Sequence, residues 1–115
     1  MNYKIRRIEE DIKRQLSLLI RNMKNLSLAS KEVSVATVRM NENFVLAKVY
    51  IRSLKGPIYA KQAVSLLNRA IGFLRHELSK NLRLKRVPQI EFIADEFLEY
   101  EEHMEKLFLK IKKGM

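Results

Sequence analysis

The sequence predicts an α+β protein whose elements follow the order α-β-β-α-α-β-α within a single domain over residues 1–115. Apolar residues recur at intervals of three and four before residue 25 and again after Pro57, the period of a helix that buries one face. Between these segments, and again after Pro88, lie short β-branched segments with the alternation of strands. A chain of 115 residues is long enough to bury one hydrophobic core.

An amphipathic helix is expected from about residue 3 to residue 24. Its apolar side chains fall on one face, and Asn2 is a suitable capping residue at its start. The apolar stripe consists of Ile5, Ile8, Ile12, Leu16, Leu19, Ile20 and Met23. Residues 25–31 are small and polar, and they predict a connection to the next element.

Two strands are expected at Val33–Met40 and Val45–Arg52, joined by the polar turn Asn41-Glu42-Asn43 into an antiparallel hairpin. Side chains alternate across a strand, so the second strand presents one apolar face and one mixed face. The apolar face consists of Val45, Ala47, Val49 and Ile51, and the mixed face consists of Leu46, Lys48, Tyr50 and Arg52. The first strand carries apolar residues on both sides, so the sequence does not assign its faces.

A pair of helices is expected after Gly56-Pro57, because proline suits the first turn of a helix. One apolar stripe precedes Gly72 and a second follows it. The stripes consist of Ala60, Ala63, Val64, Leu67 and Ile71, and of Leu74, Leu78 and Leu82. Glycine inside a helix costs about 1 kcal/mol relative to alanine. We therefore expect a bend or a close packing contact at Gly72, with a kink formed by Ala70 and Gly72.

A third strand is expected at Gln89–Ala94, directly after Val87-Pro88, since proline ends a helix and is tolerated where a strand begins. A last helix is expected over residues 97–112. Its apolar stripe consists of Phe97, Tyr100, Met104, Leu107, Phe108 and Ile111.

The net charge of +10 is unevenly distributed along the chain. Residues 1–90 contain 19 Lys and Arg against 6 Asp and Glu, whereas residues 91–115 contain 4 against 7. The densest basic stretch runs from Arg69 to Arg86, with six Lys and Arg against one carboxylate. This distribution favours a polyanionic partner such as a nucleic acid. A lysine-rich surface that only interacts with water is the alternative.

The sequence offers no support for catalysis. His76-Glu77-Leu78-Ser79-Lys80 resembles the zinc motif H-E-x-x-H, but a lysine occupies the second ligand position. The carboxylates around His103 are interpreted as a solvated acidic face rather than as metal ligands. No cysteine is present, and no apolar segment approaches the roughly 20 residues that span a bilayer. We expect a cytoplasmic protein that is not an enzyme and has no metal or cofactor.

Three blocks of sequence, in this order and spacing, resemble the ribosome-binding factor A family. They are Phe44–Ile51 in the second strand, Ala70–Arg75 at the helical junction and Leu82–Phe92 leading into the third strand. The resemblance implies a type II KH-like fold, with a three-stranded mixed sheet covered by helices on one face. KH domains clamp the nucleic-acid backbone with a GXXG loop. Here Ala70-Ile71-Gly72 stands in its place, so the resemblance implies a kink and not a clamp.

The same resemblance implies a factor that binds the free or immature 30S ribosomal subunit. It would assist late maturation of 16S rRNA, including processing of the 5′ end, as a monomer with no membrane and no small-molecule substrate. The sequence ends soon after the last predicted helix, without the longer polar tail of some members. From the residues alone, a basic KH-like scaffold that binds an acidic protein is the alternative.

The cations expected to contact RNA are Arg69, Arg75, Lys80, Arg83, Lys85 and Arg86, with Lys48 and Arg52 on the second strand and Lys4, Arg6 and Arg7 on the first helix. Cations make salt-dependent contacts with phosphates, and Tyr50 adds an aromatic surface beside two of them. Alternative roles exist for several. Arg83, Lys85 and Arg86 lie at or just past a helix end, where the helix dipole favours cations. On the first helix, Arg6, Arg7, Lys13 and Arg14 can simply solvate the outer face.

Overall fold

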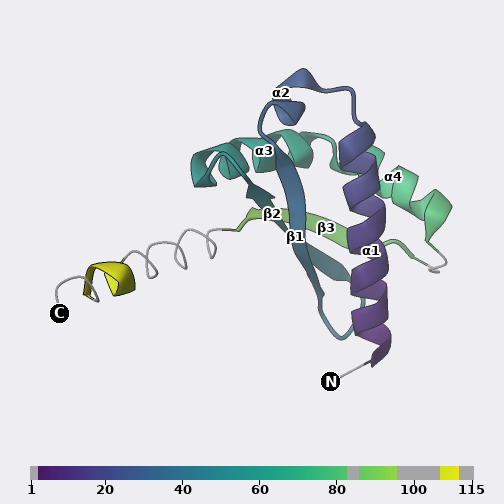
Figure 1. Cartoon of the computed structure of the whole chain (residues 1–115). Coiled ribbons are helices and arrows are strands. Elements are labelled where there is room, and N and C mark those ends of the chain that lie inside the picture. The colour runs from purple at the N-terminus through teal and green to yellow at the C-terminus, as the bar shows by residue number, and fades with distance from the viewer. Residues whose placement is uncertain (1–2, 83–85, 96–106, 112–115) are drawn as a thin grey trace.

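The computed structural model describes residues 3–82, 86–95 and 107–111 of the chain. Within these ranges the predicted mixture of helices and strands is confirmed, with three strands in one sheet (Figure 1). The elements are α1 (Tyr3–Asn22), α2 (Leu26–Ala29), β1 (Val33–Met40), β2 (Leu46–Ser53), α3 (Pro57–Arg69), α4 (Ile71–Asn81) and β3 (Gln89–Ala94).

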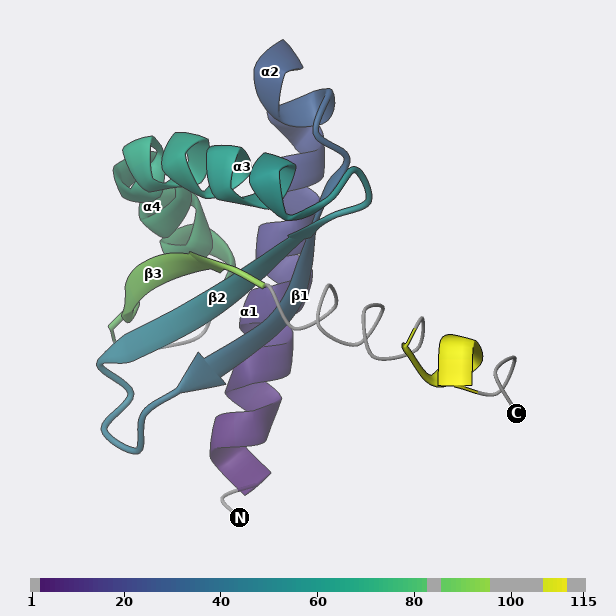
Figure 2. The same cartoon turned by 90° about the vertical axis from the view of Figure 1, so that its left-hand side faces the viewer.

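The strands lie in the order β1-β2-β3 and form a mixed sheet. β1 and β2 pair antiparallel, as the predicted hairpin requires, whereas β2 and β3 pair parallel. α1 contacts β1, while α3 contacts β2 and β3 (Figure 2). The helices cover one face of the sheet, because Val49 and Ile51 of β2 are fully buried while Lys48 on the other face is exposed.

The hydrophobic core lies between this face and the helices, and each apolar stripe predicted from the sequence before residue 95 contributes to it. Buried side chains come from each of the seven elements, which gives one continuous core. The largest fully buried residues are Ile12, Leu16, Val38, Val49, Ile51, Leu67, Leu74 and Leu78.

A bulge in β1 explains why the faces of this strand are ambiguous in the sequence. The pairing with β2 shifts between Val35 and Thr37, which leaves Ala36 as the extra residue. Val35 is buried before the bulge and Val38 after it. The buried face of the strand therefore changes from odd-numbered to even-numbered residues at the bulge. The bulge thus interrupts the alternation from which faces are predicted.

The prediction of a plain connection over residues 25–31 is wrong, because Leu26–Ala29 form the short helix α2. Asn25 caps this turn: its side-chain oxygen accepts a hydrogen bond of 3.1 Å from the N–H of Leu28. Leu28 is buried and anchors the turn to the core. Most of the predicted C-terminal helix falls outside the described residues, and residues 107–111 are helical.

The break between α3 and α4 is at Ala70, a single residue with φ −100° and ψ 10°. Its N–H donates to the carbonyl of Leu67 at 3.0 Å, and its own carbonyl accepts from Leu74 at 2.9 Å. Gly72 lies one residue inside α4, and a β-carbon added there would meet nothing within 4 Å. The close packing contact expected at Gly72 is therefore not found, and the backbone at Ala70 accounts for the interruption.

Candidate nucleic-acid interface

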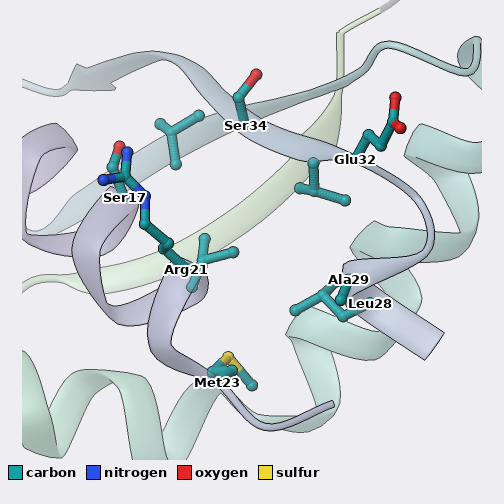
Figure 3. A pocket seen from close by; sticks show the side chains of 10 residues that line it. Ser17, Arg21, Met23, Leu28, Ala29, Glu32 and Ser34 are labelled. Atoms are coloured by element: carbon teal, nitrogen blue, oxygen red, sulfur yellow. The ribbon is translucent and has the colours of Figure 1, made fainter. Parts of the chain in front are cut away.

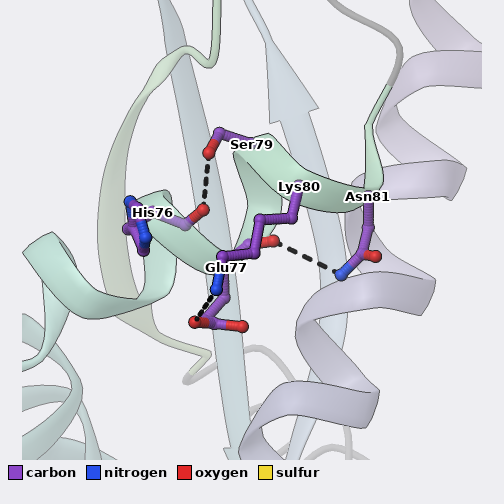
Figure 4. A network of polar contacts seen from close by, with 5 residues as sticks. All are labelled: His76, Glu77, Ser79, Lys80 and Asn81. Atoms are coloured by element: carbon purple, nitrogen blue, oxygen red, sulfur yellow. Dashed lines mark hydrogen bonds and ion pairs between the residues drawn. The ribbon is translucent and has the colours of Figure 1, made fainter.

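A groove of about 710 Å³ lies where α1 passes the end of α4. Its lining side chains are Lys4, Arg7, Ile8, Asp11, Arg14 and Gln15 from α1, with Asn81 and Leu82 from the end of α4. The two helices lie side by side, as the close view of α4 shows (Figure 4). Packing against a common core thus brings two distant parts of the sequence onto one surface.

Helical periodicity places the cations of α1 in this groove. Lys4, Arg7 and Arg14 are spaced by three and seven residues, so they project from one face of the helix. The buried stripe that includes Ile12 and Leu16 lies on a largely opposite face. Burial of that stripe therefore turns the cationic row outward and toward α4.

Positive charge predominates in the groove. Asp11 is the one carboxylate among its lining residues, and it pairs with Arg14 at 3.0 Å. Both side chains are exposed, and such surface pairs typically contribute only about 0–1 kcal/mol. Arg7 is exposed and has no hydrogen-bond or ion-pair partner within the part of the chain that the structure describes. Arg7 therefore presents positive charge to an incoming anion, beside Lys4 on the same wall.

At the other wall, the last turn of α4 is held by local contacts (Figure 4). Lys80 forms an ion pair of 3.1 Å with Glu77, and the side-chain amide of Asn81 donates to the carbonyl of Glu77 at 3.3 Å. Ser79 donates to the carbonyl of His76 at 2.5 Å. Because the Lys80–Glu77 pair is on the surface, exchanging Glu77 for a phosphate would cost little.

Arg75 makes contacts that fix the structure of the chain. Its Nε donates to the carbonyl of Pro88 at 3.1 Å, and its Nη2 donates to the carbonyl of Val87 at 3.0 Å. The guanidinium thereby ties α4 to the segment that leads into β3. These two bonds occupy donors that a phosphate would otherwise use.

The remaining cations of the Arg69–Arg86 stretch lie at different places. Arg69 is exposed at the end of α3, next to the break at Ala70, and Arg86 is exposed just before β3. Arg83 and Lys85 fall outside the described residues, directly after the groove residue Leu82 in the sequence.

The cations of β2 lie on the sheet face opposite the helices. Lys48 is exposed and, by register, stands between Arg39 of β1 and Glu91 of β3. Arg52 pairs with Asp95 at 2.9 Å and is about one-third exposed. This face, with the half-buried Tyr50 between the two cations, is separate from the groove at α1 and α4.

The structure thus brings Lys4 and Arg7 together with the end of α4, and it places Lys48 and Arg52 elsewhere. Arg6 is exposed on α1 but does not line the groove. Sequence reasoning missed Arg14 as a groove residue. Its signal was available, since Arg14 repeats the position of Arg7 after two helical turns.

Among residues 3–82, 86–95 and 107–111, no group of three histidine or acidic side chains is placed to hold a metal ion. Within the same ranges, none of the helices combines the length and the apolar character needed to cross a bilayer.

The fold and the groove define a class: a small, basic α+β protein with helices on one face of a three-stranded mixed sheet and a cationic groove between two of them. Within this class the chain belongs to the ribosome-binding factor A family, because the model of that family, described as "Ribosome-binding factor A", matches residues 4–108.

Relatives and solved structures agree with this assignment. The ribosome-binding factor A of Finegoldia magna is 35% identical, over 96% of this chain and 93% of its own length. The crystal structure of ribosome-binding factor A from Thermus thermophilus is similar with a TM-score of 0.67 and 25% identity, covering 76% of this chain and 91% of the other. A homology model of ribosome-binding factor A from Thermus thermophilus shares the fold, with a TM-score of 0.64 at 22% identity and coverage of 79% and 94%. It was fitted into a cryo-EM map of a complex with the 30S subunit.

Proposed function

We propose that this protein binds the free or immature 30S ribosomal subunit and assists late maturation of its 16S rRNA, including processing of the 5′ end. Membership of the ribosome-binding factor A family supports the 30S subunit as the binding partner. The observation that carries the mode of binding is the groove in which Lys4 and Arg7 meet the end of α4. The protein acts as a cytoplasmic, single-domain monomer over residues 1–115. It needs no catalysis, cofactor, metal, membrane or small-molecule substrate for this role.

We further infer a type II KH-like fold. The paired helices α3 and α4 beside a three-stranded mixed sheet support this inference. In KH domains a GXXG loop between such helices clamps the nucleic-acid backbone. Here Ala70 alone separates the helices, which leaves no room for a clamping loop. Binding therefore depends on the charge and shape of the helical surface.

The proposed RNA contacts form two groups of different strength. The main group consists of Lys4 and Arg7 in the groove and Lys80 in the last turn of α4, together with Arg83, Lys85 and Arg86, which follow Leu82 in the sequence. Arg6, Arg69, Lys48 and Arg52 are peripheral contacts. Arg75 ranks last, because its guanidinium already donates to two backbone carbonyls.

The mechanism is a shift between rRNA states. A protein that binds one arrangement of the rRNA more tightly than another raises the population of that arrangement, whereas equal affinity for both would change nothing. Phosphates held by Lys and Arg release counterions, which makes the affinity depend on salt. Release of the protein then follows when maturation removes the preferred arrangement.

The test is co-sedimentation of the protein with purified immature and mature 30S particles at low salt. We expect tighter binding to immature particles, and a loss of about tenfold or more in affinity for the double variant Lys4→Glu/Arg7→Glu. The matched control is Lys24→Glu/Lys55→Glu, which changes the net charge equally at positions outside the groove.

Two results would overturn the proposal. Equal losses in the two double variants would show that total charge and not the groove controls binding. If the protein does not bind 30S particles but binds an acidic protein, the basic KH-like scaffold is the correct function.

A further inference from the structure

A second hollow lies at the other end of α1, between that helix, α2 and the beginning of β1 (Figure 3). It has a volume of about 320 Å³. Its floor is apolar, with the buried side chains of Ile20, Leu28 and Val35. Arg21 and Glu32 lie at its edge and form no ion pair with any residue in the described ranges. The pocket therefore combines an apolar interior with available charges at its rim.

The same chain carries an apolar helix without a cover. All residues from 107 to 111 are exposed, including Phe108 at 63% and Ile111 at 57%. At 100° per residue, Leu107, Phe108 and Ile111 fall on one face of the helix, and Lys110 flanks that face. A face of three large apolar side chains in water is typical of a helix that docks against another surface.

We propose that residues 107–111 dock in the pocket between α1, α2 and β1 of the same chain. Size supports the match, since a cavity of about 150 Å³ is enough for a benzene ring. The pocket is about twice that size, so it can accept Phe108 together with a neighbouring apolar side chain. This proposal does not depend on ribosome binding.

Charge also favours this occupant. Lys110, beside the apolar face, can approach Glu32 at the rim. The sequence from residue 96 to residue 105 contains five glutamates and no Lys or Arg. Near the end of α1, Arg21 and Lys24 are exposed. The acidic sequence before residue 107 and the basic end of α1 carry opposite charges, which favours this occupant.

The chain between the end of β3 and Leu107 is long enough for residues 107–111 to reach the pocket. β3 ends at Ala94, which pairs with Ile51 of β2, and Ile51 also pairs with the pocket residue Val35 of β1. The C-terminal region therefore leaves the sheet at the end where the pocket lies, two strand spacings or roughly 10 Å across. About a dozen residues separate this point from Leu107, and even as a helix they span roughly 18 Å.

The chain contains no cysteine, so pairs of introduced cysteines report on docking without background. The test pair is Ala29→Cys/Lys110→Cys, with Ala29 of α2 on the pocket wall. Two control pairs combine Lys110→Cys with Asn43→Cys in the distant β1–β2 turn, or with Ile58→Cys, which belongs to another exposed apolar region. With oxidised glutathione as the oxidant, we expect the test pair to form a disulfide within one chain about tenfold faster than either control, because docking raises the effective concentration of the two thiols.

Two further sets of substitutions test the apolar contacts and the charged contacts of the docked segment. Leu107→Ser/Phe108→Ser in the test pair should lower its rate to that of the controls, and Glu32→Lys should slow it while Glu42→Lys leaves it unchanged. Equal rates in all pairs, a faster Ile58 pair, or disulfides mainly between two chains would each overturn the proposal. The last result would mean that a second copy occupies the pocket.

Discussion

Glu9 is a buried carboxylate that joins α1 to the end of β1. Its side chain is one of two buried polar side chains in the described ranges, and its Oε2 accepts a hydrogen bond of 2.7 Å from the N–H of Met40. Replacing Glu9 with alanine would leave that N–H without its acceptor. We expect Glu9→Ala to lower the free energy of unfolding by about 1–3 kcal/mol in urea denaturation. Glu10→Ala, on the exposed face, should change it by less than about 0.5 kcal/mol.

Arg75 allows a structural role to be separated from a role in binding. Because its guanidinium donates to the carbonyls of Val87 and Pro88, Arg75→Ala should lower the free energy of unfolding by about 1–3 kcal/mol. Arg69→Ala, at an exposed site, should leave stability within about 0.5 kcal/mol. Thermal unfolding of both variants gives the comparison. Unchanged stability of Arg75→Ala, with weaker 30S binding, would place this residue in the main group of RNA contacts.

At the scale of elements, Gly56 before α3 and Gly72 in the first turn of α4 differ in whether their backbone conformation needs glycine. Gly72 is exposed in the first turn of α4 and has free space around it, so Gly72→Ala should stabilise the protein by about 0.5–1 kcal/mol. Gly56 precedes α3 with φ +120°, which side chains rarely adopt, so Gly56→Ala should destabilise it. Urea denaturation of the two variants measures both effects. A destabilising Gly72→Ala would show that the glycine is needed at the kink after all.

The long elements were predictable from sequence, and the short or irregular ones were not. Strands β1 and β3 have the predicted bounds, because their β-branched runs are closed by turn residues or by Pro88. The bulge at Ala36 and the turn α2 depend on tertiary contacts, such as the burial of Leu28, which leave no periodic signal. The cations of the groove were predictable from the sequence, but the position of the groove was not. Charge identified Lys4 and Arg7, but only the packing of α1 beside α4 shows what they face.

At the scale of the whole molecule, the distribution of charge determines how binding responds to salt. The groove and the sheet face offer cations on two different sides, so a folded RNA in contact with one side need not contact the other. The logarithm of the binding constant falls linearly with the logarithm of salt concentration, and each phosphate contact adds about 0.7–0.9 to the slope. The magnitude of the slope is therefore a measure of how many Lys and Arg side chains contact RNA phosphates.

We expect Lys4→Ala/Arg7→Ala to reduce the magnitude of this slope for 30S binding by about 1.4–1.8, because both side chains line the groove. Lys24→Ala/Lys55→Ala removes the same charge from outside the groove and should leave the slope unchanged. The measurement is a titration of labelled protein with 30S particles over a series of salt concentrations. Lys48→Ala decides between the two faces: a fall of about 1 in slope would mean that the sheet face contacts RNA as well. If Lys48→Ala lowers the slope and the groove variant does not, the RNA lies on the sheet and the groove has another partner.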